Sequence, residues 1–380
     1  MLAASGQVLT LLSLTVALAA ISLPTSADCD GVRPEPGTKQ LFSEAWGTGY
    51  ANQRFQSADR TSINADKAAS LELMWVYGFS TDQPRSYPLV TEDTIFIGDG
   101  DRGLVALDRE TGCLRWENTS VPNIATAIIP ARIEGRLILV FAEREDGVHA
   151  ADALTGELLW TQTLESMEER MFSGSPLVYD DTVYVPLSSR EIGLAMNPLY
   201  ECCRTSGGVI ALDISTGKRR WYRPTIEEPG GETGKRLLVV TKYGPSGAPV
   251  WGAPTLDTEH RRLYFGTGQN YSHPATLTSD AIFAVHSGSG EIDWVRQFTA
   301  NDTYNMSCEI SESHPNCPDP VGPDLDFGAP PILYTRSDEK RLVLAGQKSG
   351  DVYALDAVTG DTLWTRSIGR GGKLGGIHWG

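Results

Sequence analysis

The chain has 380 residues, of which 41% are hydrophobic and nine are tryptophan, so it can bury a large core and is not a disordered protein. Its formal net charge of −16 at pH 7 argues against nucleic acid or an anionic membrane surface as a partner, because both attract positively charged proteins. Glycine supplies 39 of the 380 residues, about one in ten, which exceeds the ~7% average and is typical of a turn-rich globular protein.

The chain begins with an uncharged, mostly apolar segment. Residues 1–27 contain no Asp, Glu, Lys or Arg, and the run from Val8 to Leu23 is followed by Pro and small residues up to Ala27. This pattern predicts a secretory signal peptide cleaved after Ala27, which places the mature chain, residues 28–380, in the periplasm or outside the cell. A membrane anchor is the alternative, but the run is shorter than the ~20 residues that a span needs.

The six cysteines fit an oxidising compartment, where an even number favours disulfide bonds. Cys308 and Cys317 flank a short loop and are expected to bond to each other. Cys29 and Cys113 are the candidates for a further pair, and the remaining two cysteines are adjacent in the sequence. No C-x-x-C and no C-x-x-C-H occurs, which argues against a zinc site and against covalently attached haem.

An internal repeat organises the rest of the chain. Its pattern is apolar-x-Ala-x-Asp-x-x-Thr-Gly-x-x-x-Trp, with small departures in some copies. The copies are LVALDRETGCLRW (104–116), VHAADALTGELLW (148–160), VIALDISTGKRRW (209–221), IFAVHSGSGEIDW (282–294) and VYALDAVTGDTLW (352–364). The first two Trp residues are 44 positions apart, the length of one four-stranded propeller blade, and the longer later spacings leave room for insertions.

Each copy predicts a β-hairpin. The run before Asp is a strand, Asp-x-x-Thr-Gly is a tight turn in which Gly takes a positive φ, and the run into Trp is the returning strand. Because one four-stranded sheet cannot bury both faces, we expect the sheets to stack radially, with each Trp packed against the next blade. Apolar runs beginning at residues 94, 137, 182, 262 and 341 supply partner strands. The sequence therefore predicts an all-β fold, a β-propeller with tryptophan-docking repeats.

The motifs also predict the number of blades. An earlier WVYGF segment at Trp75 joins the five full motifs, so about six blades are expected. The last segment, GRGGKLGGIHWG, is glycine-rich and stops at Gly380, where another blade would open. Because propellers close by pairing their first and last strands, the expectation is a propeller that is incomplete at its C-terminus.

The stretches between the motifs resemble the pyrroloquinoline quinone (PQQ) dehydrogenases, which are eight-bladed propellers with this tryptophan-docking motif. The similarity runs from WGTGYANQRFQSA at Trp46 to the end of the chain and is strongest for the branch that oxidises polymeric alcohols. It includes PLSSREI, ECCRTSGGVIALD, GTGQNYSHPAT, DTYNMSC, DFGAPPIL and AGQKSGDVYALD. The repeat alone is less specific, because non-catalytic outer-membrane assembly propellers share it.

In this family PQQ lies in the central funnel over a Ca²⁺ ion, and the resemblance implies which residues hold the metal. Hard cations prefer carboxylate and amide oxygens, and they polarise a quinone carbonyl as a Lewis acid. Glu191 in SSREIG falls on the calcium-ligand glutamate, with an ordinary exposed loop glutamate as the alternative. The family's ligand asparagine is replaced here by Gln269, which is one methylene longer, and Asn270 follows it. Asp326 in DLDFGA completes the expected metal set.

The resemblance also implies the groups that carry out the chemistry. Asp326 falls on the aspartate that accepts the alcohol proton while hydride passes to the quinone, and the neighbouring Asp324 is the alternative base. Lys348 in AGQKSG falls on a basic residue near the quinone oxygens, where a cation stabilises developing negative charge. Otherwise Lys348 would be a hairpin lysine in solvent.

Further residues are expected to hold the cofactor ring. Trp251 in PVWGAP falls on the stacking tryptophan, with ordinary core packing as its alternative. Arg85 in PRSYPL aligns with an arginine that contacts the cofactor carboxylates, and Ser173 in MFSGSP aligns with a hydroxyl of the same site. Cys202 and Cys203 either form a disulfide over the cofactor or act as a structural clasp or pair elsewhere. The site residues come from different blades or their inserted loops, as a central-funnel site requires.

The resemblance thus implies a dehydrogenase of secondary or polymeric alcohols that uses PQQ and Ca²⁺. Without its own haem, it would pass electrons to a separate cytochrome c-type acceptor, and it would have no membrane span after signal cleavage. The alternative is a non-catalytic propeller scaffold that binds proteins. Glu191, Trp251, Asp326 and Lys348 distinguish the two, because a scaffold has no need of this set.

Overall fold

The computed structural model describes residues 40–145, 147–163, 169–236 and 239–377. The expected signal peptide and Cys29 lie outside these residues. The described α-helices are short, namely α1 (Ala65–Ala68), α2 (Glu191–Leu194) and α3 (Ser307–Ile310), and most regular structure is antiparallel β-strand. Among the described residues no helix is long and apolar enough to cross a membrane. The all-β prediction is confirmed.

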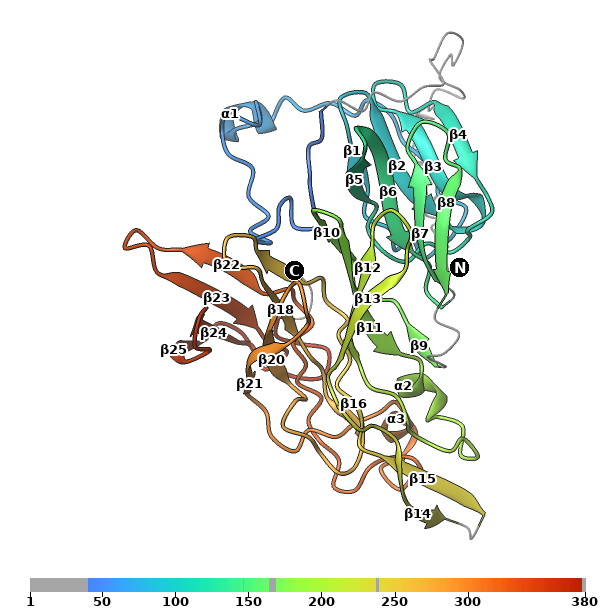
Figure 1. Cartoon of the computed structure of the whole chain (residues 1–380), viewed down its shortest axis with the longest axis vertical. Helices are drawn as coiled ribbons and strands as arrows, with labels where there is room; N and C mark the ends of the chain where they lie inside the picture. Colours follow the sequence, from blue (N-terminus) through green and yellow to red (C-terminus); the bar gives the residue numbers. More distant parts are fainter. Residues whose placement is uncertain (1–39, 146, 164–168, 237–238, 378–380) are drawn as a thin grey trace, which may run out of the picture.

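Among the described residues, five antiparallel sheets follow one another around the molecule as blades 1 to 5 (Figure 1); four have four strands and the third has five. Blade 1 holds β1 (Leu89–Val90), β2 (Thr94–Asp99), β3 (Gly103–Asp108) and β4 (Leu114–Asn118), with the 3₁₀ helix η1 (Gly100–Arg102) between β2 and β3. Blade 2 holds β5 (Ile129–Ile133), β6 (Arg136–Ala142), β7 (Gly147–Asp152) and β8 (Leu158–Thr163). Blade 3 holds β10 (Leu177–Tyr179), β11 (Thr182–Ser189), β12 (Gly208–Asp213) and β13 (Arg219–Pro224), with β9 (Arg170–Met171) paired to the end of β11.

Blade 4 holds β17 (Thr255–Asp257), β18 (Arg262–Gly266), β20 (Ala281–His286) and β21 (Ile292–Gln297). Blade 5 holds β22 (Ile332–Thr335), β23 (Arg341–Gly346), β24 (Asp351–Asp356) and β25 (Thr362–Ser367). Two strand pairs lie outside the blades: β14 (Gly231–Arg236) with β15 (Val240–Gly244), and β16 (Ser246–Gly247) with β19 (Asn270–Ser272). The apolar runs expected as partner strands are the second strands β2, β6, β11, β18 and β23.

The hydrophobic core lies between neighbouring blades. Successive residues of a strand face opposite sides of the sheet, so Ile282 packs toward blade 5 and Phe283 toward blade 3. Each interface combines side chains of two blades: Phe96 with Leu139, Val140 with Ile210, Leu177 with Phe283, and Ile282 with Leu355. Radial stacking therefore buries both faces of the inner sheets, as the repeat predicts.

The tryptophans of the first four motifs each pack on the turn glycine of the next blade. A Cβ at Gly217 would lie 2.6 Å from the ring of Trp160, and Gly217 has a φ of 68°. The Nε1 of Trp160 donates to the Ile214 carbonyl at 2.7 Å. Trp75 packs on Gly112 in the same way, although its segment forms no strand in the described structure. The expected six blades therefore correspond to five sheets and this docking segment.

We expect Gly217→Ala to lower stability by about 3 kcal/mol, because the methyl group adds overpacking against Trp160 to the cost of a positive φ. Gly135→Ala is the matched control, since Gly135 has a φ of 83° but nothing within 4 Å of the added Cβ. It should lose only about 1 kcal/mol. Thermal unfolding midpoints compare the two, and equal losses would contradict the close docking of Trp160.

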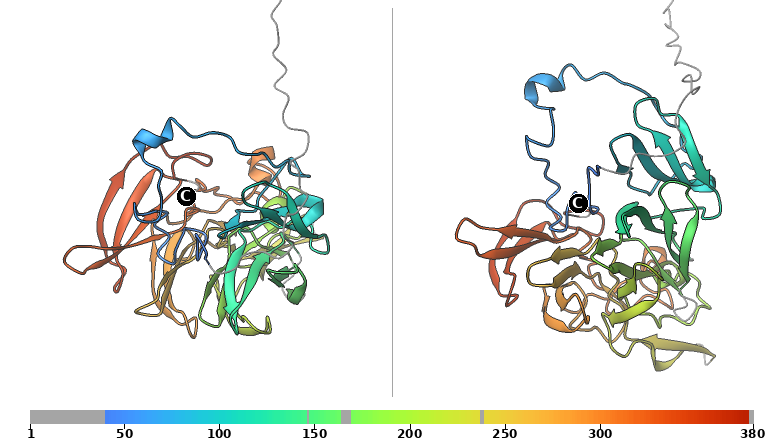
Figure 2. Two further views of the ribbon diagram at one scale, coloured as in Figure 1. Left: turned by 90° about the horizontal axis from the view of Figure 1, so that it is seen from above. Right: turned by 45° about the horizontal axis from the view of Figure 1, so that its top comes forward.

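An N-terminal strap, residues 41–56, crosses the innermost strands of several blades. The Phe42 N–H donates to the Val90 carbonyl of β1 at 3.1 Å, and the Leu333 N–H of β22 donates to the Ala51 carbonyl at 3.0 Å. The strap and the segment after it span the gap between blade 5 and blade 1 (Figure 2). On the far side of blade 5, Trp364 has 46% of its surface exposed, whereas Trp294 between blades 4 and 5 has 9%.

Candidate active site

The expected site residues occupy equivalent positions in different blades. Arg85, Ser173, Trp251 and Asp326 precede the first strands β1, β10, β17 and β22, whereas Glu191, Gln269 and Lys348 follow the second strands β11, β18 and β23. First and second strands of one blade are antiparallel, so the start of one and the end of the other lie at the same edge of the sheet. Residues far apart in sequence therefore converge on one face of the propeller.

A cavity of about 250 Å³ brings three of these residues together. Arg85, Ser173 and Trp251 all line it, and Trp46 of the N-terminal strap closes part of its wall. Among the described residues, the buried Oγ of Ser173 has no hydrogen-bond partner. A buried hydroxyl without a partner is costly, so this atom suits a polar ligand in the cavity.

Asp326 and Lys348 form a buried ion pair next to Trp251. The Lys348 Nζ lies 2.7 Å from Oδ2 of Asp326 and 3.1 Å from Oδ1 of Asp324. It also lies 5.7 Å from the ring centroid of Trp251. Lys348 is only 5% exposed and Asp326 4%, which excludes a solvent hairpin role for this lysine.

Asp324 is the alternative base, and its surroundings disfavour that role. Burial, and after it the nearby Asp326, raises the pKa of Asp324 to about 8. Burial lowers the pKa of Lys348, but Asp326 and Asp324 outweigh it and raise that pKa above its usual value, so the ammonium stays charged. A general base must be deprotonated at the working pH. The raised pKa of Asp324 makes this residue the weaker candidate.

Gln269 contacts Asp326 directly, but Asn270 does not serve the site in the same way. The Gln269 N–H donates to Asp326 Oδ1 at 2.9 Å, and the buried Oε1 of Gln269 has no partner among the described residues. The Asn270 Oδ1 accepts from the Thr276 N–H at 2.8 Å, and its Nδ2 donates to the Ser246 carbonyl at 3.0 Å. Gln269 therefore offers a free amide oxygen, while Asn270 braces a loop.

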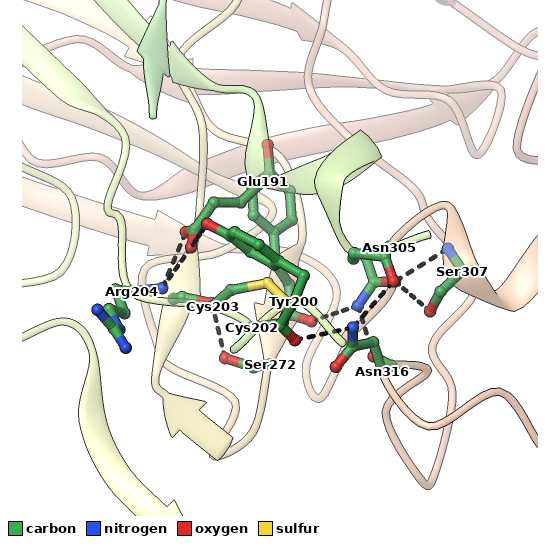
Figure 3. Close-up of a disulfide and its surroundings, with 12 residues drawn as sticks. Glu191, Tyr200, Cys202, Cys203, Arg204, Ser272, Asn305, Ser307 and Asn316 are labelled. Atoms are coloured by element: carbon green, nitrogen blue, oxygen red, sulfur yellow. Dashed lines mark hydrogen bonds between the residues drawn. A yellow bond between two sulfur atoms is a disulfide. The ribbon is translucent and has the colours of Figure 1, made fainter. Parts of the chain in front are cut away.

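Glu191 is buried, 1% exposed, and its carboxylate belongs to a separate hydrogen-bond network (Figure 3). Its Oε1 accepts from the Tyr200 hydroxyl at 2.9 Å and from the Arg204 N–H at 2.8 Å. Its Oε2 accepts from the Thr205 N–H at 2.7 Å and the Thr205 Oγ1 at 2.6 Å. Glu191 is therefore no exposed loop residue, since it anchors the loop of residues 200–205.

That loop carries the adjacent cysteines, which are bonded to each other. The structure contains the Cys202–Cys203 and Cys308–Cys317 disulfides. The bond between Cys308 and Cys317 was expected from the sequence. Cys113 is also disulfide-bonded, and its expected partner Cys29 lies outside the described residues. Cys202 lines a different cavity of about 650 Å³. Arg85, Ser173 and Trp251 are not among the residues lining it.

The expected calcium ligands do not assemble as a set. Among residues 40–377, as far as they are described, no three His, Cys, Asp or Glu side chains are grouped so that they could hold a metal ion. Asp326 is paired with Lys348, and the carboxylate of Glu191 is occupied by residues of its own loop. Of the expected ligands, Gln269 is the one whose buried side-chain oxygen has no partner among the described residues.

Two residues of this region were not expected from the sequence. Asp280 is fully buried, and neither carboxylate oxygen has a partner among the described residues. Burial, reinforced by Asp302, raises the pKa of Asp280 well above its ordinary value. Arg144 follows β6 just as Glu191 follows β11, and that equivalent position is the signal that could have drawn attention to it.

Fold and site together define a tryptophan-docking β-propeller with a polar, tryptophan-lined cavity where its blades meet. The chain belongs to the PQQ_2 family, described as "Outer membrane protein assembly factor BamB", whose family model matches residues 59–301. The expected resemblance to the PQQ dehydrogenases is confirmed.

Two polyvinylalcohol dehydrogenases are similar to this chain. The protein from Sphingopyxis sp. (strain 113P3) is 33% identical over 341 residues, and the one from Pseudomonas sp is 30% identical over 340 residues. Each match covers 88% of this chain and 52% of the relative, so the chain spans about half the length of these curated relatives. The crystal structure of quinohemoprotein alcohol dehydrogenase from Comamonas testosteroni has a TM-score of 0.64 at 19% identity, covering 87% of this chain and 49% of that chain. It supports the propeller fold.

Proposed function

We propose that this chain carries the quinone site of a PQQ-dependent dehydrogenase that oxidises secondary or polymeric alcohols. The observation that carries the proposal is the buried Asp326–Lys348 pair beside Trp251 and a cavity with an unpartnered Ser173 hydroxyl. A protein-binding scaffold gains nothing from a buried ion pair, because burying charge costs free energy. The similarity to polyvinylalcohol dehydrogenases supports the same substrate class.

The residues fit a flat, polyanionic quinone. Trp251 offers an aromatic face, Ser173 an unpartnered hydroxyl, and Arg85 a guanidinium that pairs with no carboxylate of the described residues. When bound, PQQ supplies a two-electron acceptor that takes hydride from the alcohol carbon. The protein's part is to bind the ring, orient it and handle the proton.

Asp326 is the residue that we assign to proton transfer. The Gln269 N–H holds Oδ1 and Lys348 holds Oδ2, so the carboxylate is fixed before substrate arrives. It accepts the hydroxyl proton of the alcohol as the carbon gives up its hydride. The ammonium of Lys348 stabilises negative charge that develops beside it, and burial strengthens this interaction.

Calcium, the electron acceptor and the compartment are predictions of the resemblance. Among the described residues the side chains as they lie do not form a calcium site, so we assign no step to the metal. A separate cytochrome c-type protein is the proposed electron acceptor. Periplasmic or secreted localisation is proposed from the signal-like segment, which lies outside the described residues.

A PQQ titration tests the proposal. Binding is followed by the quenching of tryptophan fluorescence, with and without Ca²⁺, and turnover by reduction of an artificial electron acceptor with a secondary alcohol. We expect saturable binding that Trp251→Ala weakens about tenfold, since aromatic stacking contributes ~0.5–1.5 kcal/mol beyond burial. Trp364→Ala, on the exposed face of blade 5, is the matched control and should bind like the parent.

Absence of PQQ binding in the presence of Ca²⁺ would remove the enzyme proposal and favour the scaffold alternative. That alternative rests on the description of the matching family as an outer-membrane assembly factor. Unchanged PQQ binding by Trp251→Ala would show that the quinone lies somewhere other than this cavity.

A further inference from the structure

A second cavity, of about 540 Å³, adjoins the one that holds Trp251. The two share Pro84, Arg85 and Ala125 in their walls. Arg144 also lines the larger cavity. Its backbone carbonyl accepts from the Phe172 N–H at 2.8 Å, so Arg144 is fixed to the residue that precedes Ser173.

The two arginines face the same space without carboxylate partners. Among the described residues neither Arg85 nor Arg144 forms an ion pair, although Arg85 donates to the Gln83 Oε1 at 3.3 Å. Burial, and after it the charge of Arg144, lowers the pKa of Arg85. Two like charges close enough to disfavour each other are stabilised by an anion between them.

Two of the three acidic residues that line this cavity bind other side chains and do not pair with Arg85 or Arg144. Glu143 binds the His149 ring at 2.9 Å and Glu145 binds Arg190 at 2.8 Å. Asp82 is the third acid of the lining and lies on its exposed side. Planar guanidinium groups match carboxylates bidentately, so the paired arginines suit a ligand with more than one carboxylate.

We propose that Arg144 is a second carboxylate-binding residue, which with Arg85 holds the acidic edge of the quinone whose ring lies against Trp251. This inference rests on the proposed function and adds a residue to its site. The ring would lie against Trp251 in the smaller cavity, and Arg85 and Arg144 would hold its carboxylates at the larger one. Arg144 thereby selects carboxylated quinones over neutral ones.

The test measures the affinity of three ligands for the same chain. They are PQQ, the neutral o-quinone 1,10-phenanthroline-5,6-dione and citrate, a tricarboxylate without a ring. Arg144→Gln removes the charge, Arg144→Lys keeps it but loses the bidentate fork, and Arg336→Gln removes an exposed arginine that is paired with Asp338 in blade 5. Unfolding midpoints confirm that each variant folds.

We expect Arg144→Gln to weaken PQQ binding by about 10- to 100-fold, the worth of a charge-assisted hydrogen-bonded pair. Arg144→Lys should fall between this variant and the parent. The rise in unfolding midpoint that citrate produces should become smaller in the same variants. The neutral quinone should bind Arg144→Gln and the parent with equal affinity. Arg336→Gln should match the parent for every ligand.

Equal PQQ affinity in Arg144→Gln and the parent would overturn the assignment of Arg144 and leave the proposed function standing. A matching loss of the neutral quinone would also overturn it, because it would show damage to the ring site rather than loss of a carboxylate contact. If the parent bound citrate but no PQQ, the proposed function and the ligand assigned to Arg144 would both be wrong.

Discussion

Replacing Asp326 by Asn should leave PQQ bound and lower the turnover of a secondary alcohol by about 10²–10⁴-fold, the usual contribution of a general base. Asn keeps the shape of the side chain, and its single amide oxygen can still accept from one of the two donors, the Gln269 N–H or Lys348. It cannot accept the proton of the alcohol. The measurement is kcat of the PQQ-loaded protein, beside the Kd for PQQ.

Asp324→Asn is the matched control, because Asp324 also contacts Lys348 and lies only two residues away. Its pKa of about 8 leaves it largely protonated at neutral pH, so its loss should change turnover less than tenfold. A larger fall for Asp324→Asn than for Asp326→Asn would transfer the role of base to Asp324. A variant of Asp326 that turns over like the parent would remove the proton-transfer mechanism.

The propeller could be predicted from sequence because each element of the repeat is fixed by contacts that are short in sequence or identical between copies. The Asp213 Oδ1 accepts from the Thr216 N–H at 3.0 Å, which sets the turn. Gly217 then takes its positive φ and makes room for Trp160. Local turn chemistry and the period of the tryptophans therefore suffice for the blades.

The Asp326–Lys348 contact could be predicted from the sequence for a related reason. Both residues flank strands of one blade, at the edge where the start of β22 meets the end of β23. The resemblance supplied the roles, and antiparallel pairing explains why the two side chains lie at the same edge. Contacts inside one blade are the easiest part of the site to predict.

The hydrogen-bond partners that inserted loops contribute could not be predicted from the sequence. Nothing in SSREIG indicates that the carboxylate of Glu191 turns toward residues 200–205, because that loop has no repeat and no fixed spacing. Arg144 was missed for a different reason. It lies between Glu143 and Glu145 in a run that looks like ordinary surface charge, and only the structure shows both acids bound elsewhere.

Replacing Glu191 by Ala should destabilise the protein by about 3 kcal/mol or more. The substitution leaves the Arg204 and Thr205 N–H groups and the Tyr200 hydroxyl without their acceptor, and each buried donor without a partner costs ~1–3 kcal/mol. An exposed loop glutamate would lose almost nothing. Glu191→Gln keeps one acceptor oxygen and should lose less than the Ala variant.

The same substitution should expose the adjacent cysteines, because Glu191 holds the loop that carries them. The rate of reduction of Cys202–Cys203 by dithiothreitol, followed by alkylation and mass spectrometry, should rise several-fold through local opening of the loop. Cys308–Cys317 is the internal comparison, since its own loop makes no contact with the Glu191 carboxylate among the described residues. Asn316 of that loop donates to the Tyr200 carbonyl at 3.2 Å, so the rate for Cys308–Cys317 should rise less than that for Cys202–Cys203.

The resemblance assigns Glu191 to calcium instead, and the two roles predict different results. A calcium ligand would lose Ca²⁺-dependent PQQ binding on substitution while the unfolding midpoint without Ca²⁺ and the reactivity of Cys202–Cys203 stay unchanged. A loop anchor loses stability and disulfide protection whether or not Ca²⁺ is present. Because all five hydrogen bonds to the carboxylate come from residues 200–205, we expect the second result. An unchanged midpoint in the metal-free protein would show that these hydrogen bonds do not hold the loop.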